Sequence, residues 1–236
     1  IPVVLTEEQK NENTKRLMVE DSIRNQYVST FYTPERANEL AKDLNIDPGK
    51  ATDYLLKSRG NWKEIELFLR NTPEEKRSKA IALLSVVSAK DLRDTPASVL
   101  YDHLNNTTDT SGIYKSDELF KSEFPAKDML FYSPYVLNPR VSNELLTSYK
   151  EYFIEYMDST LRNQLMDDPQ VLVAWVKKNI TIKNEWNPQH IPVTPIGVWK
   201  TRIADAHSRD IFFVALARTL GFISRIDPVT GKVQYY

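Results

Sequence analysis

The sequence has no cysteine among its 236 residues, which excludes disulfides, cysteine-ligated zinc, iron–sulfur clusters and a cysteine nucleophile. Only three histidines occur, so we expect no metal site and no cofactor. Six glycines are too few for a protein built from many β-hairpins. No uninterrupted apolar run of about eighteen residues occurs, so we expect no membrane span.

An excess of charge of one sign is also missing, since 31 basic residues face 32 acidic ones and the net charge is −1. Domains with a broad nucleic-acid surface usually carry a basic excess, so we expect no nucleic-acid partner. With 41% apolar and 27% charged residues, the composition is that of an ordinary globular protein. Because the chain begins with Ile1 rather than Met, we expect a processed protein or a piece of a longer one.

Residues 1–90 form the first predicted unit, a helical region. Apolar side chains recur at a spacing near four between positions 6 and 31, at Leu17, Val19, Ile23 and Tyr27. This spacing predicts a helix whose apolar stripe faces a core. Thr33-Pro34 and the segment 45–49 carry the residues that start and stop helices. Further short helices are predicted up to position 88.

Two interpretations of this region remain open. The first is a helical bundle whose stripes form its own core. The second is a protein-interaction adaptor, because Leu44, Ile46, Leu55 and the turn Asn61-Trp62 resemble ubiquitin-associated domains.

Residues 91–143 are predicted to form an irregular connector rich in proline and aromatic residues. A short helix is expected over 94–104, and the prolines of 124–141 favour an extended, packed segment. Helical spacing returns at 142–165, where one continuous helix is predicted. Asp168-Pro169 then starts another helix that continues to about Val176.

The segment 203–236 is the most informative. The run Ile211–Ala217 is apolar on all sides, which is typical of a buried central helix. Gly221 ends this helix, and residues 222–226 and 233–236 are predicted strands separated by a turn. The predicted fold class is therefore α+β, predominantly α-helical. An isolated strand pair is marginally stable, so we expect 223–236 to be covered by helices or to pair with other strands.

Several residues here resemble the nucleophile region of the transglutaminase-like superfamily, which has a papain-like fold. They are Pro195, Lys200-Thr201, the helix end Ala215-Leu216-Ala217-Arg218-Thr219-Leu220-Gly221, and Arg225. The resemblance is sharpest over 195–228 and is closest to the larger extracellular bacterial members. It implies that 144–236 is the N-terminal part of such a core, with a central helix at 206–220 and strands from 222.

The resemblance also fixes where a nucleophile would lie. In the family, the catalytic cysteine precedes the glycine at the end of the helix by fifteen residues, and that position here is Ala206. A rival alignment selects Ser208, two residues later, which turns the side chain by about 200° around the helix. Neither alignment supplies a thiol. His207 and Ser208 are weak catalytic candidates, and no histidine follows His207.

The resemblance therefore implies no catalytic residue in this chain. Four residues are candidates for lining a ligand groove: Trp199, Asp205, His207 and Asp210. The main hypothesis is a noncatalytic region of a larger exported protein, used in binding or scaffolding. Its partner would be a protein, peptide or glycan, or the remainder of its own polypeptide. The alternatives are the helical adaptor and an active amide hydrolase or acyltransferase whose His and Asp lie beyond Tyr236 or on another chain.

Overall fold

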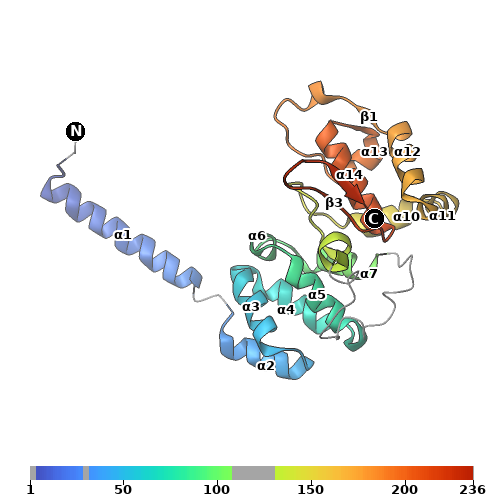
Figure 1. Ribbon diagram of the computed structural model, residues 1–236. Coiled ribbons are helices and arrows are strands. Elements are labelled where there is room, and N and C mark those ends of the chain that lie inside the picture. The colour runs from blue at the N-terminus through green and yellow to red at the C-terminus, as the bar shows by residue number, and fades with distance from the viewer. Residues whose placement is uncertain (1–3, 29–31, 108–130, 236) are drawn as a thin grey trace.

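A computed structural model of the chain describes residues 4–28, 32–107 and 131–235. These residues are predominantly helical, which confirms the coarse fold class (Figure 1). The longer helices are α1 Glu7–Val28, α2 Pro34–Leu44, α3 Pro48–Ser58, α4 Trp62–Asn71, α5 Arg77–Val86, α6 Ala89–Leu92, α7 Ala97–Asn105, α10 Tyr149–Tyr156, α11 Ser159–Asp167, α12 Pro169–Asn179, α13 Pro195–Thr201 and α14 Ala206–Thr219. Short helical turns are η1 Arg59–Asn61, η2 Glu74–Lys76, η3 Ser133–Leu137 and η4 Asn184–Trp186.

Helices α2–α7 and the turn η3 form the N-terminal lobe, residues 32–107 and 131–137. Its core is made of fully buried side chains that include Leu40, Leu55, Phe68 and Leu84. The predicted helix boundaries between positions 33 and 88 are confirmed. Thr33 caps α2, and Asp47 caps α3 by accepting a 2.7 Å hydrogen bond from the N–H of Lys50.

Residues that resemble ubiquitin-associated domains have structural roles in this lobe. Leu44 and Leu55 are buried in its core, and Ile46 packs against that core. The Asn61 side chain donates to the backbone carbonyls of Leu92 and Thr95 at 2.8 and 2.9 Å. These residues therefore hold the lobe together.

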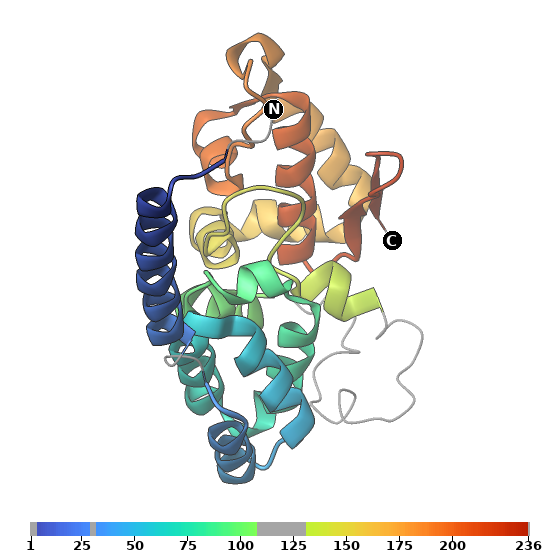
Figure 2. The ribbon, with the colours of Figure 1, turned by 90° about the vertical axis from the view of Figure 1, so that its left-hand side faces the viewer.

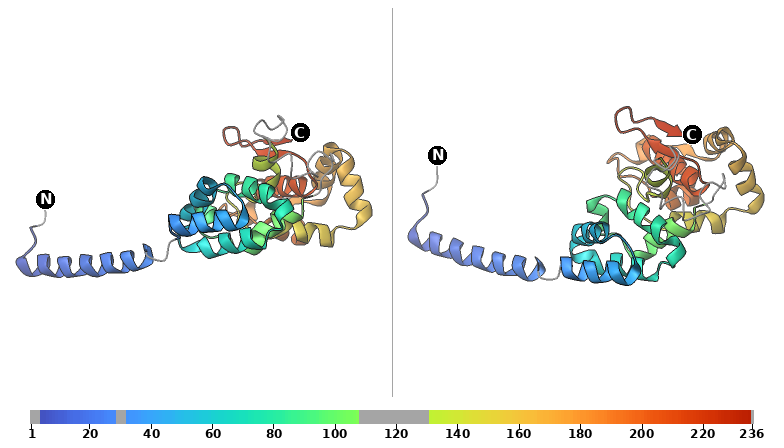
Figure 3. Two further views of the ribbon diagram at one scale, coloured as in Figure 1. Left: turned by 90° about the horizontal axis from the view of Figure 1, so that it is seen from below. Right: turned by 60° about the horizontal axis from the view of Figure 1, so that its bottom comes forward.

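Helix α1 contradicts the prediction that its apolar stripe faces a core. It meets η1 at its C-terminal end and otherwise projects from the N-terminal lobe (Figures 1 and 3). Leu17, Val19 and Ile23 are each more than half exposed. Leu17, Met18 and Val19 are consecutive and point about 100° apart, so the helix has no single apolar face to bury.

The connector 91–143 is only partly as predicted. Helix α7 lies close to the expected positions, and residues 108–130 lie outside the described residues. The expected extended conformation is wrong at 133–137, where η3 is a helical turn that buries Val136 and Leu137. Pro134 lies in the first turn of η3, where a backbone N–H would have no acceptor within the helical turn. Proline lacks this N–H, so it costs no hydrogen bond there.

The continuous helix expected over 142–165 is also wrong. Residues 142–148 form a loop, and the helical part is divided into α10 and α11. Asp158 starts α11 by accepting a 2.9 Å hydrogen bond from the N–H of Leu161. The helix α12 begins at Pro169 after the cap Asp168, as predicted.

Helices α10–α14 and four short strands form the C-terminal lobe, residues 141–235. Helix α14 lies at its centre and packs against α10, α12 and α13. The residues of 211–220 are all buried, which confirms the predicted buried helix. Figure 2 shows the two lobes stacked end to end, with η3 at their junction.

Two small strand pairs complete the C-terminal lobe. The antiparallel pair has the predicted positions, with β3 Ser224–Ile226 beside β4 Val233–Tyr235. Helix α14 covers it, and the rings of Phe213 and Tyr235 lie 5.8 Å apart. The parallel pair β1 Thr181–Ile182 and β2 Ile203–Ala204 is not predicted by the sequence, because each strand has only two residues.

The half-buried Arg140 and the buried Arg218 hold the segment 138–144 between the lobes. Arg140 Nε donates to Asp91 of the N-terminal lobe at 2.7 Å. Arg218 on α14 donates from Nη1 to the carbonyls of Asn138 and Arg140, at 2.9 and 2.8 Å. The Glu144 carboxylate accepts hydrogen bonds from the backbone N–H groups of Val141 and Ser142, both at 2.8 Å, and so closes a tight turn at 141–144. The segment thus meets the end of α14 at Arg218, and residues 142–143 reach its start at His207.

Candidate functional site

The candidate site is the N-terminal end of α14, where the family resemblance places a nucleophile. Asp205 precedes the helix in an extended conformation and is its cap residue. Its Oδ1 accepts hydrogen bonds from the backbone N–H groups of His207 and Ser208, at 3.0 and 3.1 Å. Its Oδ2 accepts from the Ser208 hydroxyl at 2.5 Å and from the Asn187 amide at 2.7 Å.

These contacts also set the ionisation of Asp205. Burial favours the neutral carboxylic acid and by itself raises the pKa. The hydrogen bonds from the Ser208 hydroxyl, the Asn187 amide and the two backbone N–H groups favour the carboxylate and outweigh burial. Together they lower the pKa of Asp205 to about 2, so the cap is a carboxylate at neutral pH.

Ala206 is the first residue of α14, and its methyl group offers no chemistry. Its backbone N–H donates to the Asn184 side-chain oxygen at 2.9 Å. The N–H of Arg209 donates to the backbone carbonyl of Asp205 at 3.0 Å. The backbone N–H groups of 206–209 are therefore all bonded within the chain. A free N–H that could stabilise an oxyanion is absent from this helix start.

Ser208 is fully buried and both hydrogen-bonding roles of its hydroxyl are used. It donates to Asp205, as above, and accepts the backbone N–H of Val193 at 2.9 Å. A serine nucleophile needs a general base that takes its proton while substrate lies against its oxygen. The Ser208 hydroxyl is buried away from substrate, and its carboxylate partner Asp205 is a weak base because its pKa is lowered to about 2.

His207 is exposed and its ring is engaged away from Ser208. Its Nε2 lies 3.0 Å from the Asn143 side-chain oxygen and 3.4 Å from the Ser142 hydroxyl. Both partners belong to the loop that Arg140 and Glu144 hold in place. The structure thus brings His207 together with residues 142 and 143, which lie 65 and 64 positions earlier.

The other two groove candidates lie in different surroundings. Trp199 is 8% exposed and packs in the core against Trp175 and Phe153, with ring centroids 5.6 and 5.5 Å apart. Asp210 is half-buried and accepts from its neighbour Arg209 at 2.8 Å. Among the four candidates, His207 alone is exposed.

Three asparagines that sequence analysis missed shape this site: Asn143, Asn184 and Asn187. Asn184 and Asn187 come from η4 and its end, 22 and 18 positions before the groups they bind. Asn187 also bonds to both backbone groups of Ile191, at 2.9 and 3.1 Å. The only sequence signal for this role was that Asn184 and Asn187 lie close together between two helices. Asparagine is common in loops of every kind, so this signal could not point to a site.

Metal binding finds no support in the part of the chain that the structure describes. No group of three or more His, Asp or Glu side chains is arranged there to hold an ion. The described residues also include no helix long and apolar enough to cross a membrane.

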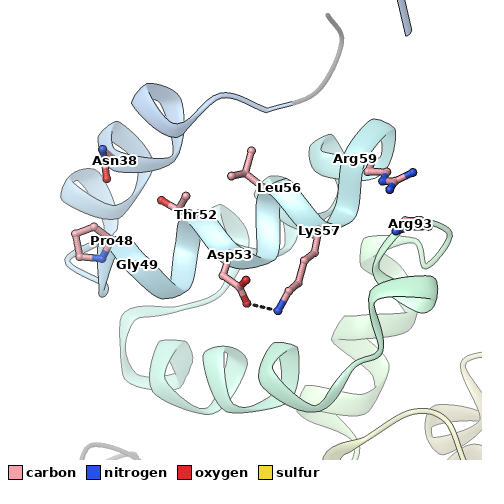
Figure 4. A pocket seen from close by; sticks show the side chains of 9 residues that line it. All are labelled: Asn38, Pro48, Gly49, Thr52, Asp53, Leu56, Lys57, Arg59 and Arg93. Carbon is pink, nitrogen blue, oxygen red and sulfur yellow. Dashed lines mark hydrogen bonds and ion pairs between the residues drawn. The ribbon is translucent and has the colours of Figure 1, made fainter. Parts of the chain in front are cut away.

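An open depression on the N-terminal lobe is separate from this site (Figure 4). It has a volume of about 580 Å³ and lies along α3. Lys57 and Asp53 form a 2.6 Å ion pair within it, and Arg59 and Arg93 lie at one end. It shares no residue with the start of α14.

Comparison with known proteins gave no relative: no family model, curated protein or solved structure matches the chain. Function is therefore inferred from the geometry of the site alone.

Proposed function

We propose that residues 144–236 are a noncatalytic transglutaminase-like region of a larger exported protein, which acts in binding or scaffolding. The observation that carries this proposal is the saturated start of α14. Its backbone donors and the Ser208 hydroxyl are all bonded to other parts of the chain. A site built for acyl transfer keeps a nucleophile and an oxyanion donor free for substrate.

The first test measures acyl transfer directly. The protein is incubated with a glutamine-rich acceptor protein and a fluorescent primary amine, and separately with a fluorophosphonate probe that labels activated serines. We expect no amine incorporation and no labelling. An active transglutaminase is the positive control, and Ser208→Ala identifies any labelling at that residue. Incorporation above that variant's level, or labelling at Ser208, would overturn the proposal.

The second test uses the absence of cysteine. Ala206→Cys introduces the only thiol of the chain, so its alkylation by iodoacetamide can be followed without background. A free helix start lowers a thiol pKa well below its usual value of about 8.5. Here the Asp205 carboxylate already occupies the helix start, so we expect the alkylation rate to rise with a pKa near the usual value. A pKa below about 7, together with amine incorporation, would contradict the proposal.

A further inference from the structure

A patch of aromatic and basic side chains lies on the outer side of the C-terminal lobe. We call it the aromatic–cationic face; it consists of Tyr152 and Tyr156 on α10, Trp175 on α12, Lys200 on α13 and Arg202 after α13. Helices α10 and α13 pack against each other beneath it. It includes none of the residues at the start of α14.

Arg202 is held rigidly in this face. It ends α13 in the left-handed conformation, with φ 58°, and its N–H bonds to the carbonyl of Val198 at 2.9 Å. Its guanidinium carbon lies 4.2 Å from the ring centroid of Trp199 and 5.0 Å from that of Trp175. These two rings stack at 23°. The cation is therefore fixed on an aromatic surface before any ligand arrives.

The Arg202 guanidinium has no acceptor within the described chain. Its Nη1 is buried without a hydrogen-bond partner, and no described carboxylate lies within ion-pair distance of it. Partial burial lowers the pKa of Arg202, which reflects a cation that has lost water without gaining a counter-charge. An arriving carboxylate would supply the missing counter-charge from the accessible side of the half-buried guanidinium, since the buried Nη1 itself is out of a ligand's reach.

Lys200 adds a second cation to the same face. Its Nζ lies 5.2 Å from the ring of Tyr152, and it has no ion pair among the described residues. Tyr152 and Tyr156 stack with centroids 4.4 Å apart, and Tyr156 is 57% exposed. Tyr, Trp and Arg are the residues most enriched at the energetic centres of protein interfaces.

We propose that the aromatic–cationic face binds an acidic segment of a protein partner, with one carboxylate on Arg202 and another on Lys200. Charge complementarity argues for the acidic segment, and the exposed Tyr156 stacked on the half-buried Tyr152 argues for a polypeptide that packs side chains beside its charges. This goes beyond the proposed function because it does not require a transglutaminase-like fold.

The test measures fluorescence anisotropy of a fluorescein-labelled peptide of alternating glutamate and tyrosine, with the glutamine–tyrosine peptide as the uncharged control. We expect the acidic peptide to bind, the glutamine peptide to bind at least tenfold more weakly, and binding to weaken as salt is raised. Unlabelled polygalacturonate serves as a competitor that carries carboxylates on a glycan.

Variants locate the binding on the face. Arg202→Asn removes the cation but keeps a residue suited to the left-handed conformation, and we expect at least tenfold weaker binding. Lys200→Gln and Tyr156→Ala change exposed residues, so they test the face even if Arg202→Asn does not fold. Lys90→Gln, an exposed cation on the N-terminal lobe, is the matched control and should leave binding unchanged.

Three results would overturn the proposal. The first is an acidic peptide that does not bind, and the second is binding unchanged in Lys200→Gln and Tyr156→Ala. The third is displacement of the bound acidic peptide by polygalacturonate at a lower carboxylate concentration than by the unlabelled acidic peptide, which would assign the face to a glycan. None of these results bears on acyl transfer, so the proposed function is tested separately.

Discussion

The hydrogen bond between Asp205 and the Ser208 hydroxyl decides whether the start of α14 is structural, and its free energy can be measured. Asp205→Ala removes the helix cap, which costs about 1 kcal/mol, and leaves the buried Ser208 hydroxyl without an acceptor, which costs about 1–3 kcal/mol. We therefore expect a total destabilisation of about 3 kcal/mol. Ser208→Ala should cost about 1–2 kcal/mol, because it frees the N–H of Val193.

The double variant isolates the interaction. If the carboxylate and the hydroxyl are partners, the two single effects overlap and the coupling free energy is about 1–2 kcal/mol. Urea unfolding followed by tryptophan fluorescence measures each variant, with the m-value as the check that unfolding stays two-state. Asp158→Ala is the matched control, since this cap accepts a hydrogen bond from Leu161 and should cost about 1 kcal/mol.

Acid should reveal the same contact. The pKa of Asp205 is lowered in the folded protein, so its stabilisation is complete above the unfolded-state value and is lost as the pH falls through the folded value of about 2. The shift corresponds to about 2 kcal/mol. Asp205→Ala should remove this part of the acid sensitivity below about pH 4.

The double-variant cycle gives the result that would refute this reasoning. If the destabilisations of Asp205→Ala and Ser208→Ala add within about 0.5 kcal/mol, the Ser208 hydroxyl is free and the noncatalytic proposal fails.

Three further predictions concern the rest of the fold. Burial holds the pKa of His103 well below its usual value, so stability should fall as the pH drops below about 6.5, by up to about 1.4 kcal/mol per unit; His103→Gln should flatten this slope in urea titrations. Arg140→Ala should cost about 3–5 kcal/mol by leaving the buried Asp91 carboxylate unpaired, and the cycle with Asp91→Ala should show strong coupling. Phe212→Ala should cost about 3–5 kcal/mol, whereas Ile23→Ala on the exposed α1 should stay within about 0.5 kcal/mol; a larger effect at Ile23 would mean that α1 packs against the protein.

Features set by neighbouring residues were predictable from the sequence. The starts of α2 and α12 follow Thr33-Pro34 and Asp168-Pro169, and in both the cap side chain bonds within its own helical turn. The extent of α14 was also predictable, because an apolar run without a polar side has to be buried. The turn before β4 follows from Asp227, whose carboxylate accepts the N–H groups of residues 229 and 230.

Features set by distant residues were not predictable. The break between α10 and α11 lies within a helical pattern, and nothing local distinguishes Asp158 as a cap rather than a mid-helix residue. The loop at 142–144 lies beside His207 because Arg140 bonds to Asp91, 49 positions earlier. The exposure of α1 depends on the absence of a complementary surface in the described chain, which its own spacing does not encode.

The start of α14 and the aromatic–cationic face differ in how far their polar groups are already satisfied within the chain. At the start of α14, each donor is matched by an acceptor from Asp205 or Asn184, and Asn187 donates to the Asp205 carboxylate, so a ligand there would have to break existing bonds. At the aromatic–cationic face, Arg202 has already lost part of its water and has no acceptor, so a carboxylate would gain a bond without breaking one. Only three residues separate Arg202 from Ala206, yet the helix start is closed to a new ligand and the face is open to one.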